Sequence, residues 1–390
     1  MNKEFYSILQ SELLSIEEKK LLRTIKEHSQ NEGAWVNLNG KKVLQFCSND
    51  YLGLSKDKRL LDSIIEAVNT YGHGSTGSRL ITGTHTPHVK LEEKLAELKK
   101  TESSLVFSCG YSANIGILSA ILTEQDAVYS DELNHASIID GIKLSKAQKY
   151  IYKHCDMEHL DEILSQNTNK HRLNIIITDS IFSMDGDRAP LKEIVNLKKK
   201  YNTVLYVDEA HSFGIYGKSG EGLLGELDLS DQAEIQMGTL SKAIGSEGGY
   251  VAGNNTLINY LINKSRSFIF STAPSIATAA ASLKAIEIIE ENPKLRENFI
   301  SNIKYFSEGL KDIETQKNFR LLPQDSAIFA IEFGNIEKTL KISHNLLDNY
   351  NIQAVAIRPP TVKQPVIRFT LSALHSKNDI DYLLNCLLEQ

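Results

Sequence analysis

An aspartate, a histidine and a lysine follow one another in an order that suits one organic cofactor. Asp208 and His211 come directly after the apolar run 204–207, and Lys242 lies in the glycine-containing segment 238–245. An aspartate at the end of a strand can keep a pyridine nitrogen protonated, and a lysine amine can form a Schiff base with an aldehyde. The histidine could hydrogen-bond a phenolic oxygen. Together these residues predict a site for pyridoxal 5′-phosphate (PLP).

Two further segments could hold the phosphate of such a cofactor. Residues 108–114 follow a predicted strand and open a helical pattern, so backbone N–H groups would face an anion, and Gly110 would allow it to approach closely. Thr239 offers a hydroxyl near Lys242. Residues 72–79 end in an arginine; this segment is either a flexible loop or a contact for a phosphate or carboxylate.

Other polar residues are single candidates. His135 also follows a predicted strand, and its ring could lie over an aromatic cofactor, although a lone histidine more often has a structural role. Arg358 and Arg368 offer two guanidinium groups, one of which could bind a substrate carboxylate through two parallel hydrogen bonds. The remaining histidines and the four dispersed cysteines show no metal-ligand spacing, so no metal site is predicted.

The letters Asp208-Glu-Ala-His211 also match the metal and water site of a helicase-type ATPase. Such an enzyme needs a P-loop, and the sequence contains no G-x-x-x-x-G-K-[ST] motif. The nearest fragment, 217–219, follows the aspartate and has Ser212 where the first glycine belongs. The formal charge of −6 also disfavours nucleic acid as a partner.

The elements that must position these residues belong to an α/β fold. Seven short runs typical of strands alternate with helical patterns after residue 100, at 104–108, 127–130, 149–152, 174–178, 203–207, 234–237 and 249–252. This alternation predicts a mostly parallel sheet. Asp208 then lies at the carboxyl end of a strand, where open α/β sheets bind ligands.

We expect three parts along the 390 residues: an N-terminal helical segment over 1–45, a large cofactor-binding domain over 46–280, and a smaller α+β domain over 281–390. Apolar residues at helical spacing predict a helical lead-in over about the first 30 residues. A long helix is predicted over 275–291, and strands near 327–333 and 366–370. The sequence shows no signal peptide and no membrane-spanning segment, which predicts a cytoplasmic protein without a membrane partner.

Several ordered blocks resemble the α-oxoamine synthases, which are PLP-dependent enzymes of fold type I, the aspartate aminotransferase fold. The matching blocks lie at 48–54, 74–79, 131–140, 181–187, 208–211, 239–249, 270–272 and 358–371. The resemblance implies a large domain with a mostly parallel seven-stranded sheet, a smaller α+β C-terminal domain, and a homodimer with shared active sites.

The resemblance also implies residue roles. Lys242 would carry the cofactor, Asp208 would pair with its pyridine nitrogen, His135 would stack on its ring, and His211 would complete the catalytic group. The implied cofactor contacts also include Gly110, Tyr111, Ser183, Thr239, Ser271 and Thr272, of which the last two would reach the partner subunit's phosphate. Tyr111 replaces a common phenylalanine. The implied substrate contacts are Arg23, Asn49, Ser78, His135, Thr361 and Arg368; Arg368 would bind the amino-acid carboxylate, and the surroundings of Arg23 match the family poorly.

Members of this family condense an amino acid with an acyl thioester and release carbon dioxide. The segment 358–363 is most similar to the member that joins L-alanine to pimeloyl-CoA or a pimeloyl-carrier protein in biotin biosynthesis. The alternative is the member that uses glycine and acetyl-CoA, because it shares the cofactor motifs. A catalytically silent partner subunit of the same fold is disfavoured by the presence of Lys242. Acyl length, the form of the donor and the choice of amino acid depend on pocket shape.

Overall fold

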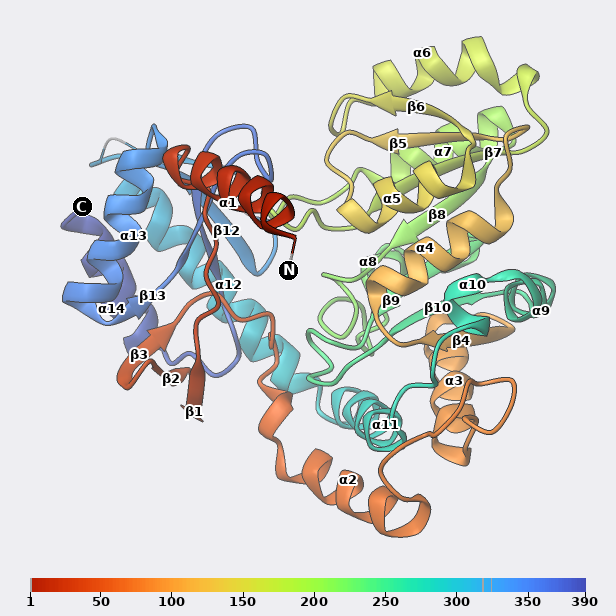
Figure 1. The fold of residues 1–390 in the computed structure, drawn as a ribbon, viewed down its shortest axis with the longest axis horizontal. Helices are drawn as coiled ribbons and strands as arrows, with labels where there is room; N and C mark the ends of the chain where they lie inside the picture. The colour runs from red at the N-terminus through yellow and green to blue at the C-terminus, as the bar shows by residue number, and fades with distance from the viewer. Residues whose placement is uncertain (1, 318, 324) are drawn as a thin grey trace. The chain divides into compact units, whose positions relative to one another are not determined.

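The computed structural model describes residues 2–317, 319–323 and 325–390 and divides into two compact units (Figure 1). We call residues 49–183 and 187–300 the large unit. Residues 1–48, 184–186 and 301–390 form the small unit. These boundaries differ from those predicted at residues 45 and 280, because the N-terminal segment belongs to the same unit as the C-terminal part, and the large unit continues to residue 300.

A seven-stranded sheet runs through the large unit, as predicted. Its order is β4 (Ser103–Phe107), β10 (Gly249–Gly253), β9 (Ile235–Thr239), β8 (Val204–Asp208), β7 (Asn174–Asp179), β5 (Ala127–Asp131) and β6 (Gln148–Tyr152). Strand β10 is antiparallel to β4 and β9, and the pairs from β9 to β6 are parallel. Each predicted run overlaps one strand, and all of these strands except the exposed edge strand β6 are mostly buried, as strands covered on both faces of a sheet are.

Helices connect these strands and cover the sheet. They are α2 (Lys58–Tyr71), α3 (Thr86–Lys99), α4 (Gly110–Ile121), α5 (Ala136–Ser145), α6 (Met157–Asn167), α7 (Leu191–Tyr201), α8 (Leu223–Glu226), α9 (Asn255–Lys264), α10 (Arg266–Ile269) and α11 (Ile276–Glu291). Helices α4 and α5 lie side by side and bury Ile117 and Ile138 against Ile177 of the sheet (Figure 1). Because β5, β7 and β8 are parallel, their last residues meet at one edge of the sheet.

The small unit contains two four-stranded sheets. The first has the order β1 (His28–Glu32), β2 (Trp35–Leu38), β3 (Lys41–Gln45) and β13 (Ile352–Gln353). The second has the order β11 (Arg320–Leu321), β12 (Ile328–Glu332), β15 (Val366–Thr370) and β14 (Val355–Ile357). The helices of this unit are α1 (Lys3–Glu18), α13 (Ile336–Tyr350) and α14 (Lys377–Leu388), and α12 (Pro293–Glu314) contains the boundary at residue 300. The strands predicted near 327–333 and 366–370 are β12 and β15.

The predicted N-terminal helix is too long. Helix α1 ends at Glu18, where Lys20 adopts a left-handed φ of 58° and the Leu21 amide donates a hydrogen bond to the Ile16 carbonyl. This backbone arrangement ends a helix even where apolar spacing continues. Among the described residues, no helix combines the length and apolar composition that a bilayer span requires.

Candidate active site

Lys242 lies at the end of a row of three side chains in the large unit. Its Nζ is 2.8 Å from His211 Nε2, and His211 Nδ1 is 2.8 Å from the hydroxyl of Tyr51. Tyr51 is only 1% exposed, and its hydroxyl is 3.3 Å from Asn49 Oδ1. The lysine amine therefore lies against an imidazole whose position is fixed by a buried phenol.

Asp208 ends β8 and is held by two neutral donors. Its Oδ2 accepts a hydrogen bond from Asn114 Nδ2 at 2.8 Å, and its Oδ1 accepts one from the Ala210 amide at 2.9 Å. Asn114 is itself fixed, because it accepts a hydrogen bond from the Tyr206 hydroxyl and donates one to Ser137. Neutral donors orient the buried carboxylate without cancelling its charge, which leaves it suited to a cationic ring nitrogen.

His135 caps the N-terminus of α5 close to these groups. Its Nδ1 is 2.7 Å from Ser137 Oγ, and its backbone N–H donates to Asp179 Oδ2 at 2.7 Å. Burial lowers the pKa of His135, the charge of Asp208 opposes this effect, and the charge of Lys242 lowers the pKa further. The ring is therefore neutral at pH 7. The same interactions place His135 within the electrostatic influence of Asp208 and Lys242.

The two predicted phosphate contacts are neighbours. Gly110 begins α4, and a methyl group added there would lie 3.5 Å from Thr239 Oγ1. A methyl group at Gly249 would lie 2.7 Å from the Gly110 Cα, so the β10 backbone packs directly against this turn. The hydroxyl of Tyr111 donates to Asp140, while the Tyr111 amide remains in the first turn of α4. Amides of a first helical turn have no partner within the helix and can bind an anion.

The segments around Ser78 and Thr272 form an isolated antiparallel bridge, which brings these two predicted residues together, and Ser271 is adjacent. Ser183 lies in the loop that follows β7. A backbone contact of residues 72–79 with a phosphate or carboxylate stays a prediction, but the Arg79 guanidinium has another partner. Arg79 is buried and donates two hydrogen bonds of 2.8 Å to the carboxylate of Glu92, so its guanidinium serves the fold.

The remaining predicted substrate contacts lie in the small unit. Arg23 and Thr361 line one cavity of about 700 Å³. Its other basic lining residues are Lys20, Lys26, His28, His344 and Arg358, and its apolar lining includes Leu21, Leu22, Leu340, Leu347, Val355 and Ile357. Arg368 does not line this cavity and is buried in β15. Burial raises the pKa of Cys47 to about 11, and the charge of Arg368 partly opposes this rise.

A buried ion pair next to Asp208 was not predicted from the sequence. Lys99 and Glu209 are both 0% exposed and form a salt bridge. Glu209 also accepts a hydrogen bond from the Leu224 amide at 2.9 Å, and Lys99 donates to the Glu221 carbonyl. A lysine at the end of a helix gives no sequence signal for such a partner. The pair anchors the turn that carries Asp208 and His211.

We predict that Lys99→Met destabilises the protein by about 3–5 kcal/mol, because Glu209 would keep an uncompensated buried charge. Urea unfolding of the apo protein measures this loss. The double variant Lys99→Met/Glu209→Leu should recover much of the stability. The matched control is Lys58→Met, because Lys58 forms an exposed pair with Asp62 and its removal should leave the unfolding midpoint unchanged. If Lys99→Met and Lys58→Met lowered the unfolding free energy equally, the buried pair of Lys99 and Glu209 would not have the stabilising role assigned to it.

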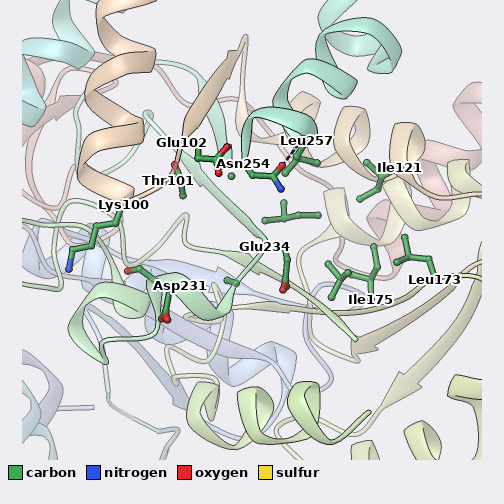
Figure 2. A pocket seen from close by; sticks show the side chains of 15 residues that line it. Lys100, Thr101, Glu102, Ile121, Leu173, Ile175, Asp231, Glu234, Asn254 and Leu257 are labelled. Atoms are coloured by element: carbon green, nitrogen blue, oxygen red, sulfur yellow. Dashed lines mark hydrogen bonds between the residues drawn. The ribbon is translucent and has the colours of Figure 1, made fainter. Parts of the chain in front are cut away.

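The large unit also contains a cavity, whose lining residues are drawn in Figure 2 and include none of the residues clustered around Lys242 and Asp208. It encloses about 420 Å³, and its lining residues Ile175, Val204 and Ile235 lie at the beginnings of strands whose ends carry the site. Its acidic lining groups already have partners: Glu234 pairs with Lys198, Glu102 accepts a hydrogen bond from the Asn255 amide, and Asp231 accepts one from the Gln232 side chain. The candidate active site is therefore the cluster at the carboxyl edge of the sheet.

Known proteins resemble this chain over nearly its whole length. Residues 41–387 match the family described as aminotransferase class I and II. The chain is 42% identical to 8-amino-7-oxononanoate synthase of Petrotoga mobilis, covering 98% of this chain and 97% of the relative. It is also 42% identical to that of Bacillus pumilus, covering 100% and 98%. The structure resembles serine palmitoyltransferase from S. paucimobilis with bound PLP–myriocin, with a TM-score of 0.92, 28% identity, and coverage of 100% and 98%.

Proposed function

We propose that this chain, which belongs to the class I and II aminotransferase family, acts as an 8-amino-7-oxononanoate synthase, because relatives with that name match it over nearly its full length. The reaction joins L-alanine to the pimeloyl group of pimeloyl-CoA or a pimeloyl-carrier protein. It releases carbon dioxide and the free thiol, and its product serves biotin biosynthesis. The observation that carries the proposal is the cluster of Lys242, His211 and Asp208 at the carboxyl edge of the large sheet.

The residues of the large unit fit PLP. The buried carboxylate of Asp208 suits a protonated pyridine nitrogen, and the first turn of α4 at Gly110, next to Thr239, supplies backbone amides and a hydroxyl that would hold the phosphate. The neutral ring of His135 suits stacking on an aromatic face. When bound, PLP withdraws electrons from the amino-acid Cα and makes its proton easier to remove. Ser183 and His211 are the proposed contacts of its phenolic oxygen.

In this proposal Lys242 performs the proton transfers. Its Nζ removes the Cα proton of L-alanine and returns a proton to the product carbon after decarboxylation. His211, fixed by Tyr51, holds the amine in place between these steps. Asp208 balances positive charge throughout. Arg368 binds the alanine carboxylate until it leaves as carbon dioxide.

The small-unit cavity supports a pimeloyl donor. A pimeloyl thioester ends in a carboxylate after an apolar chain, and the cavity combines four lysine or arginine side chains and two histidines with an apolar lining. An acetyl group needs neither feature. We therefore assign Arg23 and Thr361 to the distal carboxylate of the donor.

The experiment measures products by mass spectrometry with L-alanine plus pimeloyl-CoA and with glycine plus acetyl-CoA. We expect 8-amino-7-oxononanoate from the first pair only, and product from the second pair only would overturn the proposal. Arg23→Gln should raise KM for pimeloyl-CoA by about tenfold or more, with KM for alanine unchanged, because a charge-assisted contact is lost. Arg320→Gln is the control, since Arg320 is exposed and does not line the cavity.

The proposal includes a homodimer. Ile81 and Phe270 are large apolar residues that are 80% and 72% exposed, and they flank the bridge between Ser78 and Thr272. A partner subunit would cover them and receive Ser271 and Thr272 at its phosphate. We predict that Phe270→Asp shifts the protein towards monomer in sedimentation and lowers activity in parallel. Leu144→Asp, at an exposed apolar position on α5, should leave the dimer intact.

A further inference from the structure

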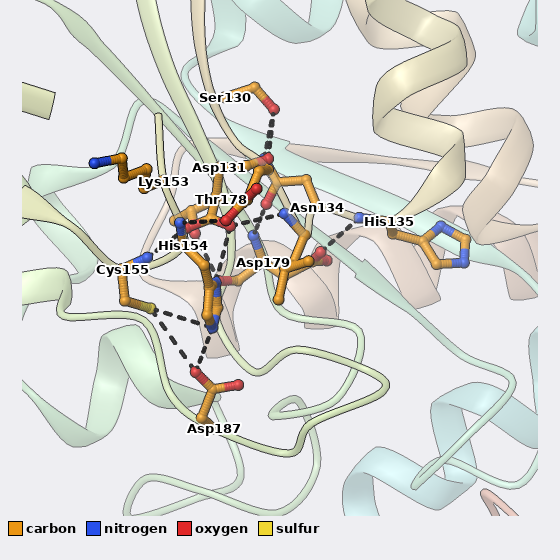
Figure 3. A network of polar contacts seen from close by, with 12 residues as sticks. Ser130, Asp131, Asn134, His135, Lys153, His154, Cys155, Thr178, Asp179 and Asp187 are labelled. Carbon is orange, nitrogen blue, oxygen red and sulfur yellow. Dashed lines mark hydrogen bonds and ion pairs between the residues drawn. The ribbon is translucent and has the colours of Figure 1, made fainter. Parts of the chain in front are cut away.

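Three loops at the carboxyl edge of the large sheet meet at one imidazole (Figure 3). His154 follows β6, and its two ring nitrogens face two different carboxylates. Nδ1 is 2.9 Å from Asp131 Oδ1, at the end of β5, and Nε2 is 2.7 Å from Asp187 Oδ2, in the loop after β7. The sequence around His154 shows no metal-ligand spacing, and the proposed mechanism does not use this histidine.

The contact with Asp131 reaches the loop that carries His135. Asp131 is buried, and its Oδ1 also accepts a hydrogen bond from the Leu133 amide at 2.9 Å. Its Oδ2 accepts one from the Cys155 amide at 2.9 Å, so the β5 and β6 loops are joined twice. The His154 amide adds a third link to Glu132 Oε1 at 3.2 Å. His135 is the last residue of this loop.

The contact between Asp187 and His154 Nε2 fixes the imidazole on the side opposite Asp131. The Phe182 amide donates to the Asp187 carbonyl at 3.0 Å, and the Phe182 ring meets the His154 ring edge-on, with centroids 4.4 Å apart. Ser183 follows Phe182 in the same loop. The imidazole is thus held by both a carboxylate and an aromatic ring from the β7 loop, and it cannot turn without breaking one of its two ion pairs.

His154 is a cation rather than a neutral ring. Burial lowers its pKa, but the hydrogen bonds to Asp131 and Asp187 outweigh this effect and raise the pKa to about 12. With both nitrogens donating, the ring offers no lone pair to a metal ion, although Asp131, His154 and Cys155 lie within ligand distance of one another. The charged and titratable groups facing the ring are Asp131, Asp185, Asp187 and Cys155.

We propose that His154 is a positioning residue, which holds His135 in place by tying its loop to the loop after β7. The inference rests on the proposed function, since His135 is the proposed stacking residue. Figure 3 shows the His135 ring pointing away from the network while its backbone joins it through Asp179. Asn134 contributes a parallel anchor, because it donates to the Ile177 carbonyl and accepts from the Asp179 amide. Loss of His154 should therefore loosen the loop without unfolding it.

The first test uses apo protein and does not depend on activity. Selective ¹⁵N labelling of histidine should show both ring nitrogens of His154 protonated at pH 9. In His154→Gln, whose amide can replace only the bond to Asp187, hydrogen exchange should accelerate at 131–136 by at least about tenfold, the scale of one charge-assisted hydrogen bond. His171→Gln is the matched control, because His171 bonds Tyr150 of the same strand β6. A singly protonated ring or unchanged exchange would overturn the proposal.

The second test separates positioning from general stability. In PLP-loaded His154→Gln we expect kcat to fall by about 10- to 100-fold with KM for alanine nearly unchanged, since small displacements of a catalytic group cost this much. Asp187→Asn should reproduce the loss. Adding His154→Gln to His135→Ala should lower kcat by less than about twofold more, because both changes act through one group.

If the losses of kcat in the two single variants multiplied in the double variant His154→Gln/His135→Ala, His154 would act independently of His135, and the inference would be refuted. A normal kcat in His154→Gln with only a lower melting temperature would do the same. If the wild-type protein forms no 8-amino-7-oxononanoate, the proposed function fails instead, and the exchange and NMR results still test the connection between the loops.

Discussion

Replacing Lys242 with alanine is expected to abolish synthesis of 8-amino-7-oxononanoate and the visible absorbance of lysine-bound PLP. Lys242 is the amine next to His211, and we propose that it both anchors the cofactor and moves the Cα proton. General acid–base catalysis by one side chain typically contributes about 10²- to 10⁴-fold. Because the covalent anchor is lost as well, we expect kcat to fall by about 10⁴-fold or more. Product mass spectrometry and an absorbance spectrum of the reconstituted protein measure the two effects.

Two further variants make this result specific to the amine. Lys242→Arg keeps the positive charge, but a guanidinium stays protonated at neutral pH and cannot take the Cα proton, so it should be as inactive as the alanine variant. Lys264→Ala removes a lysine from the last turn of α9 and should leave kcat unchanged. Turnover in Lys242→Ala above about 1% of the wild-type rate would remove this residue from the mechanism.

Most of the large sheet could be predicted from the sequence because six of its seven strands are almost entirely buried, the exception being the edge strand β6. Such strands leave continuous apolar runs, and each run ended near a polar residue such as Asp208 or Thr239. The membership of the small unit could not be predicted in this way. It depends on the parallel pairing of β3 with β13, where Leu44 faces Ile352, and no local pattern reports a contact between such distant segments.

The same distinction applies to the site. Residues at strand ends were identified individually, while the groups that hold them were not. Tyr51 contacts His211 across 160 positions, and Asn114 contacts Asp208 across 94. Both supporting residues lie inside segments that the sequence analysis had selected, but their partners follow only from the fold. The mutual arrangement of functional side chains therefore depends on tertiary contacts more than their identity does.

The second large loss of activity that we expect follows removal of the negative charge of Asp208. We expect Asp208→Asn to retain PLP, because the proposed phosphate and lysine contacts remain, but to lose most of its activity. An amide cannot balance a protonated pyridine nitrogen. Removing one partner of a buried ion pair typically costs about 3–5 kcal/mol, which corresponds to about 10²- to 10⁴-fold in rate. Steady-state kcat and the PLP content of the purified variant are the measurements.

The hydrogen bonds that hold Asp208 predict a graded series of losses in kcat. Asn114→Ala removes one of the two donors that orient the carboxylate but leaves its charge, so kcat should fall by about tenfold, the effect of one hydrogen bond. Asp208→Asn/Asn114→Ala should be little worse than Asp208→Asn alone, because Asn114 acts through the carboxylate that is already absent. If Asp208→Asn kept wild-type activity, the negative charge would have no part in catalysis, and Asn114 would be a structural residue only.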